Sequence, residues 1–402
     1  MKKILVFLIL LIIPFNVFAD EIDINSNNAI LYNLDNNEIL YEKNKDDKVL
    51  IASLTKIMTS IVAIENISDF NEKVIITNEI LSPLAYDLSK AGFEVNEEVT
   101  YNDLLYGSLL PSGADATHSL AIFLSGSEEN FVELMNQKAK ELGMNNTHFE
   151  NSIGIETENN NHYSSAEDMA KLLKYCIENK KFLEVFTTNK YVTSNGKHEF
   201  TSSKYKAEKK NAKDFSIIKG SKTGYTDLAG LCLASISSKD SPKLLLITIG
   251  ANPDTDSIGH FNDTEKIYDY FYKNYEYINI LKKGKILDLV TVYDNPVTIN
   301  QVKNVSKYIK KDIELTYEYK GEKVLNKGTK SGDKIGTYYV KNGDDILYQE
   351  DIYSPVTVNF KLSVSQKVII ITVLTLIVLF KIVLKKIYKK CWKIIAKMIK
   401  WL

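Results

Sequence analysis

Two residues near the start of an apolar segment have the types and the spacing of a nucleophile and its base. In Ser53-Leu54-Thr55-Lys56 the hydroxyl and the amine are three positions apart, so on a helix they lie one turn apart on the same face. A serine hydroxyl is a poor nucleophile at its free pKa, and a lysine whose pKa is lowered by burial or by a second cation can take its proton. The same four residues also fit a Ser N-cap followed by a solvated lysine.

Two further short motifs combine polar side chains with glycine. A Ser-Gly-Ala sequence at Ser112–Ala114 lies between two helical patterns, where a plain turn is the alternative interpretation. A Lys-Thr-Gly sequence at Lys222–Gly224 precedes two apolar runs, where a strand end with a glycine turn is the alternative. Each motif is weak by itself, but the three together, in this order and at these separations, are far more specific.

Hydrophobic periodicity predicts the helices that must position these motifs. The helix at 165–177 is expected to open with a capping box, because Ser164 precedes Glu167 by three positions. The expected helices cover residues 54–64, 101–109, 115–124, 129–142, 165–177 and 263–274.

Apolar runs predict strands at both ends of the same region. The runs at 29–32 and 39–41 flank a polar turn, which is a hairpin signal. The runs at 228–238 and 244–250 predict a second, well-buried antiparallel hairpin. Strands at both ends with helices between them predict one α/β domain over residues 20–277, in which the terminal strands share a sheet.

Residues 281–362 have a different pattern. Short runs rich in Val, Ile and Tyr alternate with turns that contain glycine, and the helical spacing stops. This pattern predicts a small all-β domain. It contains no cluster of titratable side chains that looks catalytic, so we interpret it as a spacer.

Both ends of the chain carry topological signals. Residues 1–19 have a basic start, an apolar run and a small-x-small ending, the pattern of a secretory signal peptide, with an uncleaved anchor as the alternative. Residues 368–384 are long and apolar enough for a transmembrane helix. Eight Lys and no acidic residue follow from Lys381 onward, so the positive-inside rule places the body outside the cytoplasm and the tail within.

The tail at 385–402 places lysines on one side of a helix and apolar residues on another. It is expected to lie along the cytoplasmic membrane as a basic amphipathic helix. A merely solvated basic flank is the alternative.

Composition limits the remaining classes of function. The chain of 402 residues is 45% apolar and 25% charged, as in ordinary globular proteins, and its net charge is -1. Because the basic residues are all Lys and many lie at the two ends, the body is acidic, and we expect no nucleic-acid partner. Three cysteines without paired spacing exclude a disulfide framework, although an isolated Cys176–Cys232 bridge stays open.

The motifs, taken together, resemble the serine D-Ala-D-Ala carboxypeptidases, the low-molecular-mass penicillin-binding proteins of the peptidase S11 family. The resemblance covers nearly the whole chain and includes the β domain, the signal and the anchor. It implies a transpeptidase-like α/β fold, shared with the serine β-lactamases, in which helices flank an antiparallel sheet. It rests on residues 52–59, 110–113, 146–154, 162–170 and 222–226.

The resemblance also implies a mechanism and a set of roles. The substrate would be the peptidoglycan stem pentapeptide, which loses its terminal D-alanine, and β-lactams would acylate the same serine. No metal or cofactor is expected. The implied catalytic residues are Ser53 as nucleophile, Lys56 as general base and Ser112 as proton relay to the leaving D-alanine. The implied substrate-binding residues are Lys222, Thr223, Gly224 and Tyr225, with the N–H groups of Ser53 and Tyr225 as the oxyanion hole.

The chain departs from the family pattern at two positions. Ala114 stands where the second motif normally has Asn, which removes an amide that would orient the general base; Asn102 or a water could substitute. The chain has no Arg to help hold the substrate carboxylate, and His260 is the nearest candidate for a weaker, pH-dependent clamp.

The sequence leaves three alternatives to an active carboxypeptidase. The five histidines show no His-x-x-x-His spacing, which disfavours a metallopeptidase, and His148 and His162 are expected to order packing and loops. A serine β-lactamase is disfavoured because no Glu-x-x-Leu-Asn segment is found. A catalytically weak or idle, membrane-tethered wall-binding protein remains the main competitor, because of Ala114.

Overall fold

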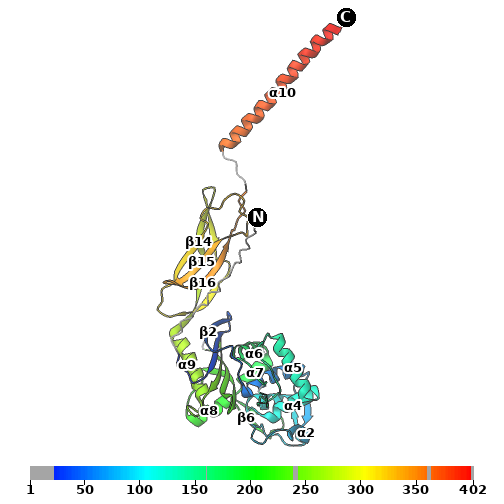
Figure 1. Cartoon of the computed structure of the whole chain (residues 1–402), viewed down its shortest axis with the longest axis vertical. Coiled ribbons are helices and arrows are strands. Elements are labelled where there is room, and N and C mark those ends of the chain that lie inside the picture. The colour runs from blue at the N-terminus through cyan, green and yellow to red at the C-terminus, as the bar shows by residue number, and fades with distance from the viewer. Residues whose placement is uncertain (1–21, 160, 239–242, 360–363, 400–402) are drawn as a thin grey trace, which may run out of the picture. The chain divides into compact units, whose positions relative to one another are not determined.

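The computed structural model describes residues 22–159, 161–238, 243–359 and 364–399. They divide into two compact units (Figure 1). The first runs to Ile278 and takes in Lys307–Lys311, and the second consists of Asn279–Ser306 and of the chain from Asp312 onward. The predicted signal segment, residues 1–19, lies outside the described residues.

An antiparallel sheet of five strands forms the centre of the first unit. Its order is β2-β1-β9-β8-β7, so the two strands that open the unit pair with three from its other end. Leu31 lies opposite Leu246 across β1 and β9, and Thr223 lies opposite Leu233 across β7 and β8. This order confirms the two predicted hairpins and the shared sheet, although the link at 239–242 is outside the described residues. The strands are β1 (Asn28–Asn33), β2 (Glu38–Lys43), β7 (Ile218–Thr226), β8 (Gly230–Ser238) and β9 (Lys243–Ala251).

The helices of the first unit confirm the predicted helical segments, with shifts at the ends. The largest shift is in the last helix, which begins at Gly259 and not near Asp263. The Asp263 carboxylate instead accepts hydrogen bonds from Asn25 and Ser26, far away in the chain. The helices are α1 (Thr55–Asn66), α2 (Asn78–Leu81), α3 (Tyr101–Leu109), α4 (Ala114–Ser125), α5 (Glu128–Glu141), α6 (Ala166–Glu178), α7 (Lys180–Thr187), α8 (Ser203–Asn211) and α9 (Gly259–Asn274).

The start of α6 corrects one prediction. Its N-cap is Ser165, whose Oγ accepts a hydrogen bond from the Asp168 N–H at 3.1 Å. Ser164 is engaged elsewhere, because its Oγ is 2.7 Å from Thr147 Oγ1, and its carbonyl accepts the Val49 N–H at 2.8 Å. The predicted capping box from Ser164 to Glu167 therefore does not form.

Both faces of the sheet are buried, because neighbouring strand residues point to opposite sides. Ile30 of β1 and Ile247 of β9 belong to a core shared with α1, α3, α4, α5, α6 and α7. Leu31 and Leu246 belong to a second core, which includes Phe271 of α9. In Figure 1, α6 and α7 accordingly lie on one side of the sheet and α9 on the other. The sheet therefore has helices on both faces, and its edge strand β7 packs against α7 and the turn before α1.

Short hairpins complete the first unit. The part of the second unit that precedes α10 is built of strands, as predicted for the all-β region. The described part of the second unit contains the sheets β11-β12 and β14-β15-β16, and β10 pairs with β13. The remaining strands are β3 (Lys73–Ile75), β4 (Glu98–Thr100), β5 (Lys190–Val192), β6 (Glu199–Thr201), β10 (Tyr275–Leu281), β11 (Ile286–Val292), β12 (Asn295–Asn300), β13 (Val305–Lys310), β14 (Thr316–Gly321), β15 (Lys334–Asn342) and β16 (Asp345–Tyr353).

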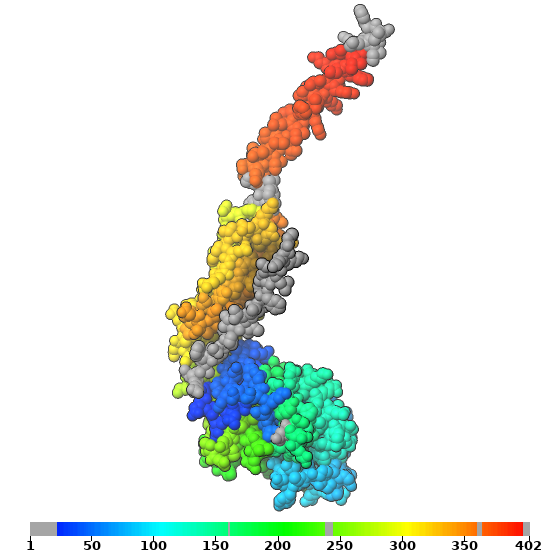
Figure 2. Space-filling model, in the orientation of Figure 1, coloured from blue at the N-terminus to red at the C-terminus, as the bar shows by residue number. Residues whose placement is uncertain are grey.

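A single helix, α10 (Val364–Ile399), contains the predicted transmembrane segment and most of the basic tail. Its stretch Val364–Ala396 is long and apolar enough to cross a membrane, and the side chains of that stretch are exposed. This is compatible with membrane anchoring. Figure 2 shows one face of this helix. The cysteines carry free thiols, buried at Cys176 and Cys232 and exposed at Cys391, so the bridge that the sequence left open is not formed.

Candidate active site

Ser53 lies in a tight turn that leads into α1. The residues Ala52–Leu54 form a short 3₁₀ helix directly before Thr55, the first residue of α1. Ala52 has φ = 46°, a left-handed conformation that costs a non-glycine residue about 1–3 kcal/mol. A strained backbone persists only where surrounding contacts hold it, so contacts with the rest of the unit must hold the turn before Ser53 in this conformation.

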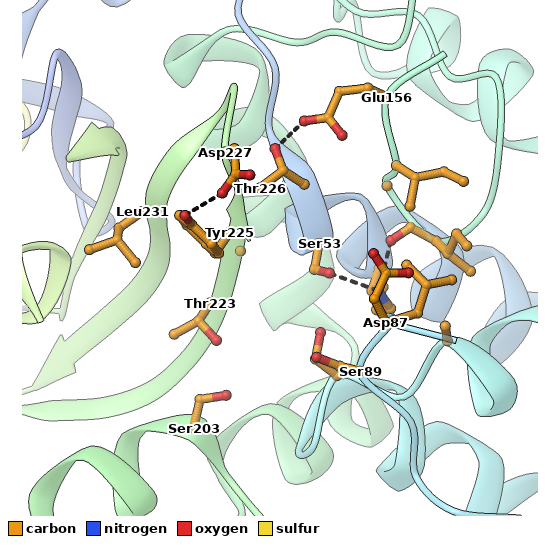
Figure 3. Close-up of a pocket in the computed structure, with 18 of the residues that line it drawn as sticks. Ser53, Asp87, Ser89, Glu156, Ser203, Thr223, Tyr225, Thr226, Asp227 and Leu231 are labelled. Carbon is orange, nitrogen blue, oxygen red and sulfur yellow. Dashed lines mark hydrogen bonds between the residues drawn. The ribbon is translucent and has the colours of Figure 1, made fainter. Parts of the chain in front are cut away.

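Lys56 lies one turn after Ser53 and is buried, with a relative exposure of 3%. Its Nζ is 2.8 Å from Ser53 Oγ and 2.7 Å from the Ile153 carbonyl oxygen (Figure 3). Burial lowers the pKa of Lys56 to about 7, although the nearby Asp115 carboxylate opposes the shift. An amine with this pKa is substantially neutral near pH 7 and can accept a proton from the hydroxyl that it touches.

The Ile153 carbonyl was not found by sequence reasoning, because a backbone group gives no residue-type signal. It lies in a segment that side chains hold in place. Asn151 Oδ1 accepts the Gly154 N–H at 2.7 Å, and a Glu128 carboxylate oxygen accepts the Ser152 N–H at 2.6 Å. The carbonyl therefore has a fixed position from which to orient Lys56.

Ser112 and Lys222 form a second contact pair. Lys222 Nζ donates to Ser112 Oγ at 2.7 Å and to the Thr223 carbonyl at 2.7 Å. Lys222 is 1% exposed, and its pKa is lowered well below the usual value by burial, with repulsion from Lys56 as the second cause. Ser112 itself has φ = 62°, so the turn before α4 is also held in a left-handed conformation.

Gly224 lets strand β7 approach Ser53 closely. A Cβ at this position would lie 3.0 Å from the Ile51 carbonyl oxygen and 3.1 Å from the Ser53 nitrogen, tighter than ordinary van der Waals contact. Glycine is therefore required by the close packing of the strand against the turn. This approach brings Tyr225, the next residue, to the cleft beside Ser53 (Figure 3).

A cleft of about 710 Å³ unites these elements. In Figure 3, Ser53 faces it between Thr223 and Tyr225 of β7 on one side and Asp87 and Ser89 on the other. Lys222 is not at its surface and touches the site through Ser112. The sequence-predicted residues that line the cleft are Ser53, Lys56, Ser112, Thr223, Gly224, Tyr225 and His260.

His260 lies in the first turn of α9, at the cleft wall, and is 6% exposed. Burial lowers its pKa to about 4, although Asp256 opposes the shift. Its Nδ1 is buried without a hydrogen-bond partner among the described residues. The imidazole is therefore neutral near pH 7, so it offers a hydrogen bond and not a permanent charge.

Ala114 also lines the cleft, at the start of α4. Asn102, which the sequence suggested as a substitute for the missing amide, is committed elsewhere: its Nδ2 donates to the Tyr191 hydroxyl at 3.0 Å, and it does not line the cleft. The described contacts of Lys56 instead come from Ser53 and Ile153.

The wall opposite β7 is anchored by Asp115, a residue that sequence reasoning missed. Its carboxylate accepts the N–H groups of Ala91, Gly92 and Phe93 at 2.7, 2.8 and 3.2 Å. These residues lie two to four positions after Ser89, which lines the cleft. Asp115 therefore ties the Ser-Gly-Ala turn to the wall that faces Ser53.

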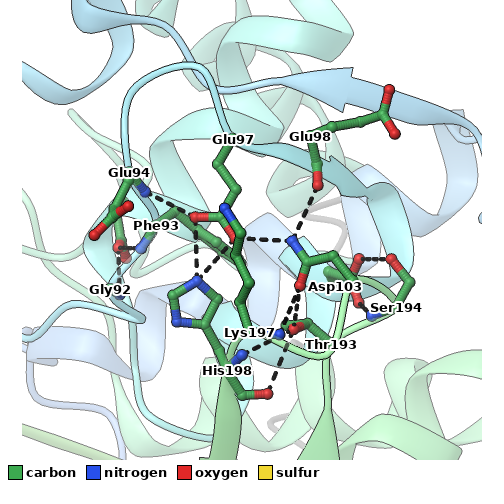
Figure 4. A network of polar contacts seen from close by, with 12 residues as sticks. Gly92, Phe93, Glu94, Glu97, Glu98, Asp103, Thr193, Ser194, Lys197 and His198 are labelled. Atoms are coloured by element: carbon green, nitrogen blue, oxygen red, sulfur yellow. Dashed lines mark hydrogen bonds and ion pairs between the residues drawn. The ribbon is translucent and has the colours of Figure 1, made fainter.

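The chain beyond this wall is fixed by a buried polar network (Figure 4). His198 Nε2 is 2.9 Å from Glu97 Oε1, and Asn195 Nδ2 donates to the same oxygen at 2.9 Å. The Asp103 carboxylate accepts from the Ser194 N–H at 2.8 Å and from its hydroxyl at 2.6 Å. The turn between β5 and β6 is thereby joined to the segment that carries the cleft wall.

The histidines of the first unit do not assemble a metal site. Among the described residues, no group of three or more His, Cys, Asp or Glu side chains could hold a metal ion. His162 is buried behind Ser53 with hydrogen bonds to Thr55 and Glu150, and His148 bonds the Asn161 carbonyl. Both therefore order local structure, as expected.

The chain is similar to known proteins over most of its length. The D-alanyl-D-alanine carboxypeptidase family, peptidase S11, matches residues 15–253. D-alanyl-D-alanine carboxypeptidase DacF of Bacillus subtilis is 28% identical over 346 residues, which are 83% of this chain and 86% of that protein. A D-alanyl-D-alanine carboxypeptidase of a Streptomyces strain is 32% identical over 243 residues, 58% of this chain and 81% of that protein.

Solved structures agree in fold. The D-alanyl-D-alanine carboxypeptidase DacD of Francisella tularensis has a TM-score of 0.70 at 25% identity and covers 90% of this chain and 97% of its own. Penicillin-binding protein 5 of Haemophilus influenzae has a TM-score of 0.65 at 24% identity, over 84% of this chain and 98% of its own. The family match spans more than half of the sequence, and the chain therefore belongs to the D-alanyl-D-alanine carboxypeptidase family of serine hydrolases, peptidase S11.

Proposed function

We propose that this protein removes the terminal D-alanine of peptidoglycan stem pentapeptides through an acyl-enzyme on Ser53. The observation that carries the proposal is the 2.8 Å contact between Ser53 Oγ and Lys56 Nζ, with the pKa of Lys56 lowered to about 7. A buried amine that is partly neutral and touches a serine hydroxyl in an open cleft is the arrangement that nucleophilic catalysis needs.

The steps follow from these contacts. Lys56 takes the Ser53 proton as Oγ attacks the carbonyl carbon of the penultimate D-alanine, and the N–H groups of Ser53 and Tyr225 stabilise the oxyanion. The C–N bond then breaks, and the proton held by Lys56 passes through Ser112 to the departing amine, so that Ser112 is left unchanged and Lys56 is neutral again. Lys56 next takes a proton from the water that attacks the ester, the bond between Ser53 Oγ and the acyl carbon breaks, and Lys56 returns that proton to Ser53 as the shortened peptide leaves. Ser112 suits the relay because it bonds Lys222 and lines the cleft.

The substrate carboxylate is proposed to bind beside β7. Thr223 lines the cleft next to the buried Lys222, and an anion bound there would favour the protonated form of Lys222. His260 supplies a hydrogen bond from the opposite element, because its Nδ1 is buried and free of described partners. We propose that β-lactams, which also carry a carboxylate, acylate Ser53 in the same cleft.

We further propose that the catalytic unit works outside the cytoplasm, tethered by α10. The helix is apolar enough to span a membrane, and the lysines that follow it favour a cytoplasmic tail. The substrate is then reached on the outer side of the membrane.

The first experiment measures free D-alanine released from a D-Ala-D-Ala-terminated stem peptide by the full-length protein in detergent. Release is expected from the native protein and not from Ser53→Ala, which also loses covalent penicillin labelling. A folded native protein that releases nothing, or a Ser53→Ala variant that is still labelled, would refute the proposal.

Ala114 supports a second candidate, a membrane-tethered protein that binds the wall but turns over slowly or not at all. The test is Ala114→Asn. Because Ile153 already holds Lys56, we expect the rate of D-alanine release to change by less than about threefold. A gain of about a hundredfold would instead mean that the missing amide limits the native protein, and would favour the idle candidate.

A further inference from the structure

One buried histidine is directly behind the nucleophile and has no part in the proposed chemistry. His162 is 2% exposed, and its ring packs edge-on against Phe149 with centroids 5.6 Å apart. Its Nε2 is 2.8 Å from Thr55 Oγ1, and its Nδ1 is 3.1 Å from the Glu150 nitrogen. Thr55 is the first residue of α1, between Ser53 and Lys56.

The hydrogen bonds determine the state of the ring. The Glu150 N–H can only donate, so His162 Nδ1 must accept and the ring proton lies on Nε2. Nε2–H therefore donates to Thr55 Oγ1. That hydroxyl has one proton of its own, and it donates it to the Ala52 carbonyl oxygen at 2.8 Å. The result is a one-way chain of donors from His162 to Ala52.

The end of this chain is the strained residue before the nucleophile. Ala52 has φ = 46°, and its carbonyl oxygen lies where a Cβ on Gly154 would be 2.1 Å away. The carbonyl is thus packed against Gly154 and bonded to Thr55. A rotation of the Ala52 peptide out of this position would move both the Ser53 nitrogen and the Ser53 side chain.

We propose that His162 and Thr55 are positioning residues that hold the left-handed Ala52 peptide, and through it the Ser53 hydroxyl and N–H, in the reactive orientation. The proposal rests on Ser53 being the nucleophile. His162 does not carry protons in the reaction, because it contacts neither Ser53 nor Lys56 and its hydrogen bonds require the neutral ring. Burial is the first cause that lowers its pKa to about 4, so the ring stays neutral through the neutral pH range.

The experiment measures acylation of the full-length protein by a fluorescent penicillin, resolved into non-covalent affinity and acylation rate. Thr55→Val removes the hydroxyl at constant shape and is expected to lower the acylation rate about ten- to a hundredfold with little change in affinity. Thr55→Ser keeps the hydroxyl and is expected to stay within about threefold of native. His162→Leu is expected to behave like Thr55→Val, and His162→Gln, which keeps a donor, to recover most of the rate.

Thr147→Val is the control for loss of a hydrogen-bonded threonine hydroxyl at a half-buried position away from Ser53. Thr147 Oγ1 bonds Asp168 and Ser164 at 2.9 and 2.7 Å and none of residues 52–56. The Thr147→Val variant is expected to have a lower thermal stability than the native protein and the same acylation rate when folded. The pH midpoint of acylation is expected to be the same in His162→Gln as in the native protein, because a neutral ring adds no charge near Lys56.

The outcomes separate this proposal from the one on which it rests. If the native protein is not acylated at Ser53, the proposed function fails. If the native protein is acylated and Thr55→Val and His162→Leu keep the native rate, only the positioning role is overturned. A changed pH midpoint in His162→Gln would also overturn it, because His162 would then take part in proton transfer.

Discussion

At the scale of single residues, the site depends on Lys56, whose pKa of about 7 leaves part of the amine neutral at neutral pH. Lys56 is enclosed by protein, and its two described contacts are a hydroxyl and a carbonyl oxygen, neither of which carries a charge. Burial outweighs the opposing field of the Asp115 carboxylate. It therefore favours the neutral amine of Lys56, which is the form that a general base must have.

This arrangement predicts the pH dependence of acylation. Only the neutral form of Lys56 can accept the Ser53 proton, and its pKa is about 7. The acylation rate by penicillin should therefore rise about tenfold per pH unit below that value and level off above it. Stopped-flow labelling between pH 5.5 and 9 measures the profile. A rate that is flat, or that falls as the pH rises through 7, would contradict Lys56 as the base.

At the scale of elements, the cleft depends on how closely an edge strand approaches a helix start. Strand β7 touches the turn before Ser53 only because residue 224 has no side chain. The opposite wall is held by Asp115 at the start of α4, and the chain beyond it by the network around Glu97. Each wall therefore has an anchor that can be tested separately.

Gly224→Ala tests the strand. The added Cβ would lie 3.0 Å from the Ile51 carbonyl oxygen and must push β7 away from Ser53. We expect the acylation rate to fall more than about tenfold, because small displacements of reacting groups have large effects on rate. Labelling kinetics together with circular dichroism check that the loss is in the site and not in folding. A native rate in the variant would mean that β7 does not need this approach.

Glu97→Gln tests the polar network that holds the chain beyond this wall. Burial raises the pKa of Glu97, but hydrogen bonds from Glu94, Asn195 and His198 outweigh it, and the net pKa is below 4.5. A carboxyl with a lowered folded-state pKa stabilises the fold above its unfolded value of 4.5, and this stabilisation is lost as the pH falls through the folded-state pKa. At pH 7 the variant should lose about 1–3 kcal/mol of unfolding free energy, and the difference should shrink in acid.

The matched control for this prediction is Glu199→Gln. Glu199 pairs with Lys190 on the surface of the neighbouring hairpin, and its side chain is 58% exposed. We expect its loss to change the unfolding free energy by less than about 0.5 kcal/mol. Near-UV circular dichroism in urea, at pH 7 and pH 4, measures both variants. Equal effects of the two substitutions would contradict the special role of the buried carboxylate.

At the scale of the whole molecule, a catalytic unit, a β-stranded unit and one apolar helix follow each other in the chain. The cysteines provide a direct test of the proposed topology. Cys391 is exposed on α10, whereas Cys176 and Cys232 are buried. A membrane-impermeant thiol reagent should leave the protein in intact cells unlabelled and should label Cys391 after permeabilisation, with Cys391→Ser as control. Labelling of Cys391 in intact cells would place the tail outside.

Much of this architecture could be predicted because its signals are local. Short apolar runs indicated β1 and β9, helical spacing indicated α3 and α6, and a long apolar run indicated α10. Helix ends were less predictable, because Ser164 and Asp263 have capping residue types but form hydrogen bonds with distant segments. The short helices α7 and α8 were not predicted, since isolated short helices depend on tertiary packing more than on their own sequence.

By itself, the sequence determined which residues were candidates for the chemistry, since residue types and motif order can be recognised along the chain. Only the tertiary structure decided how they meet. It brought Ile153 to Lys56 across 97 positions and Lys222 to Ser112 across 110. It also buried Lys56 and His260 and so lowered their pKa values. Burial and long-range contact are properties of the packed chain, and no local pattern of residues encodes them.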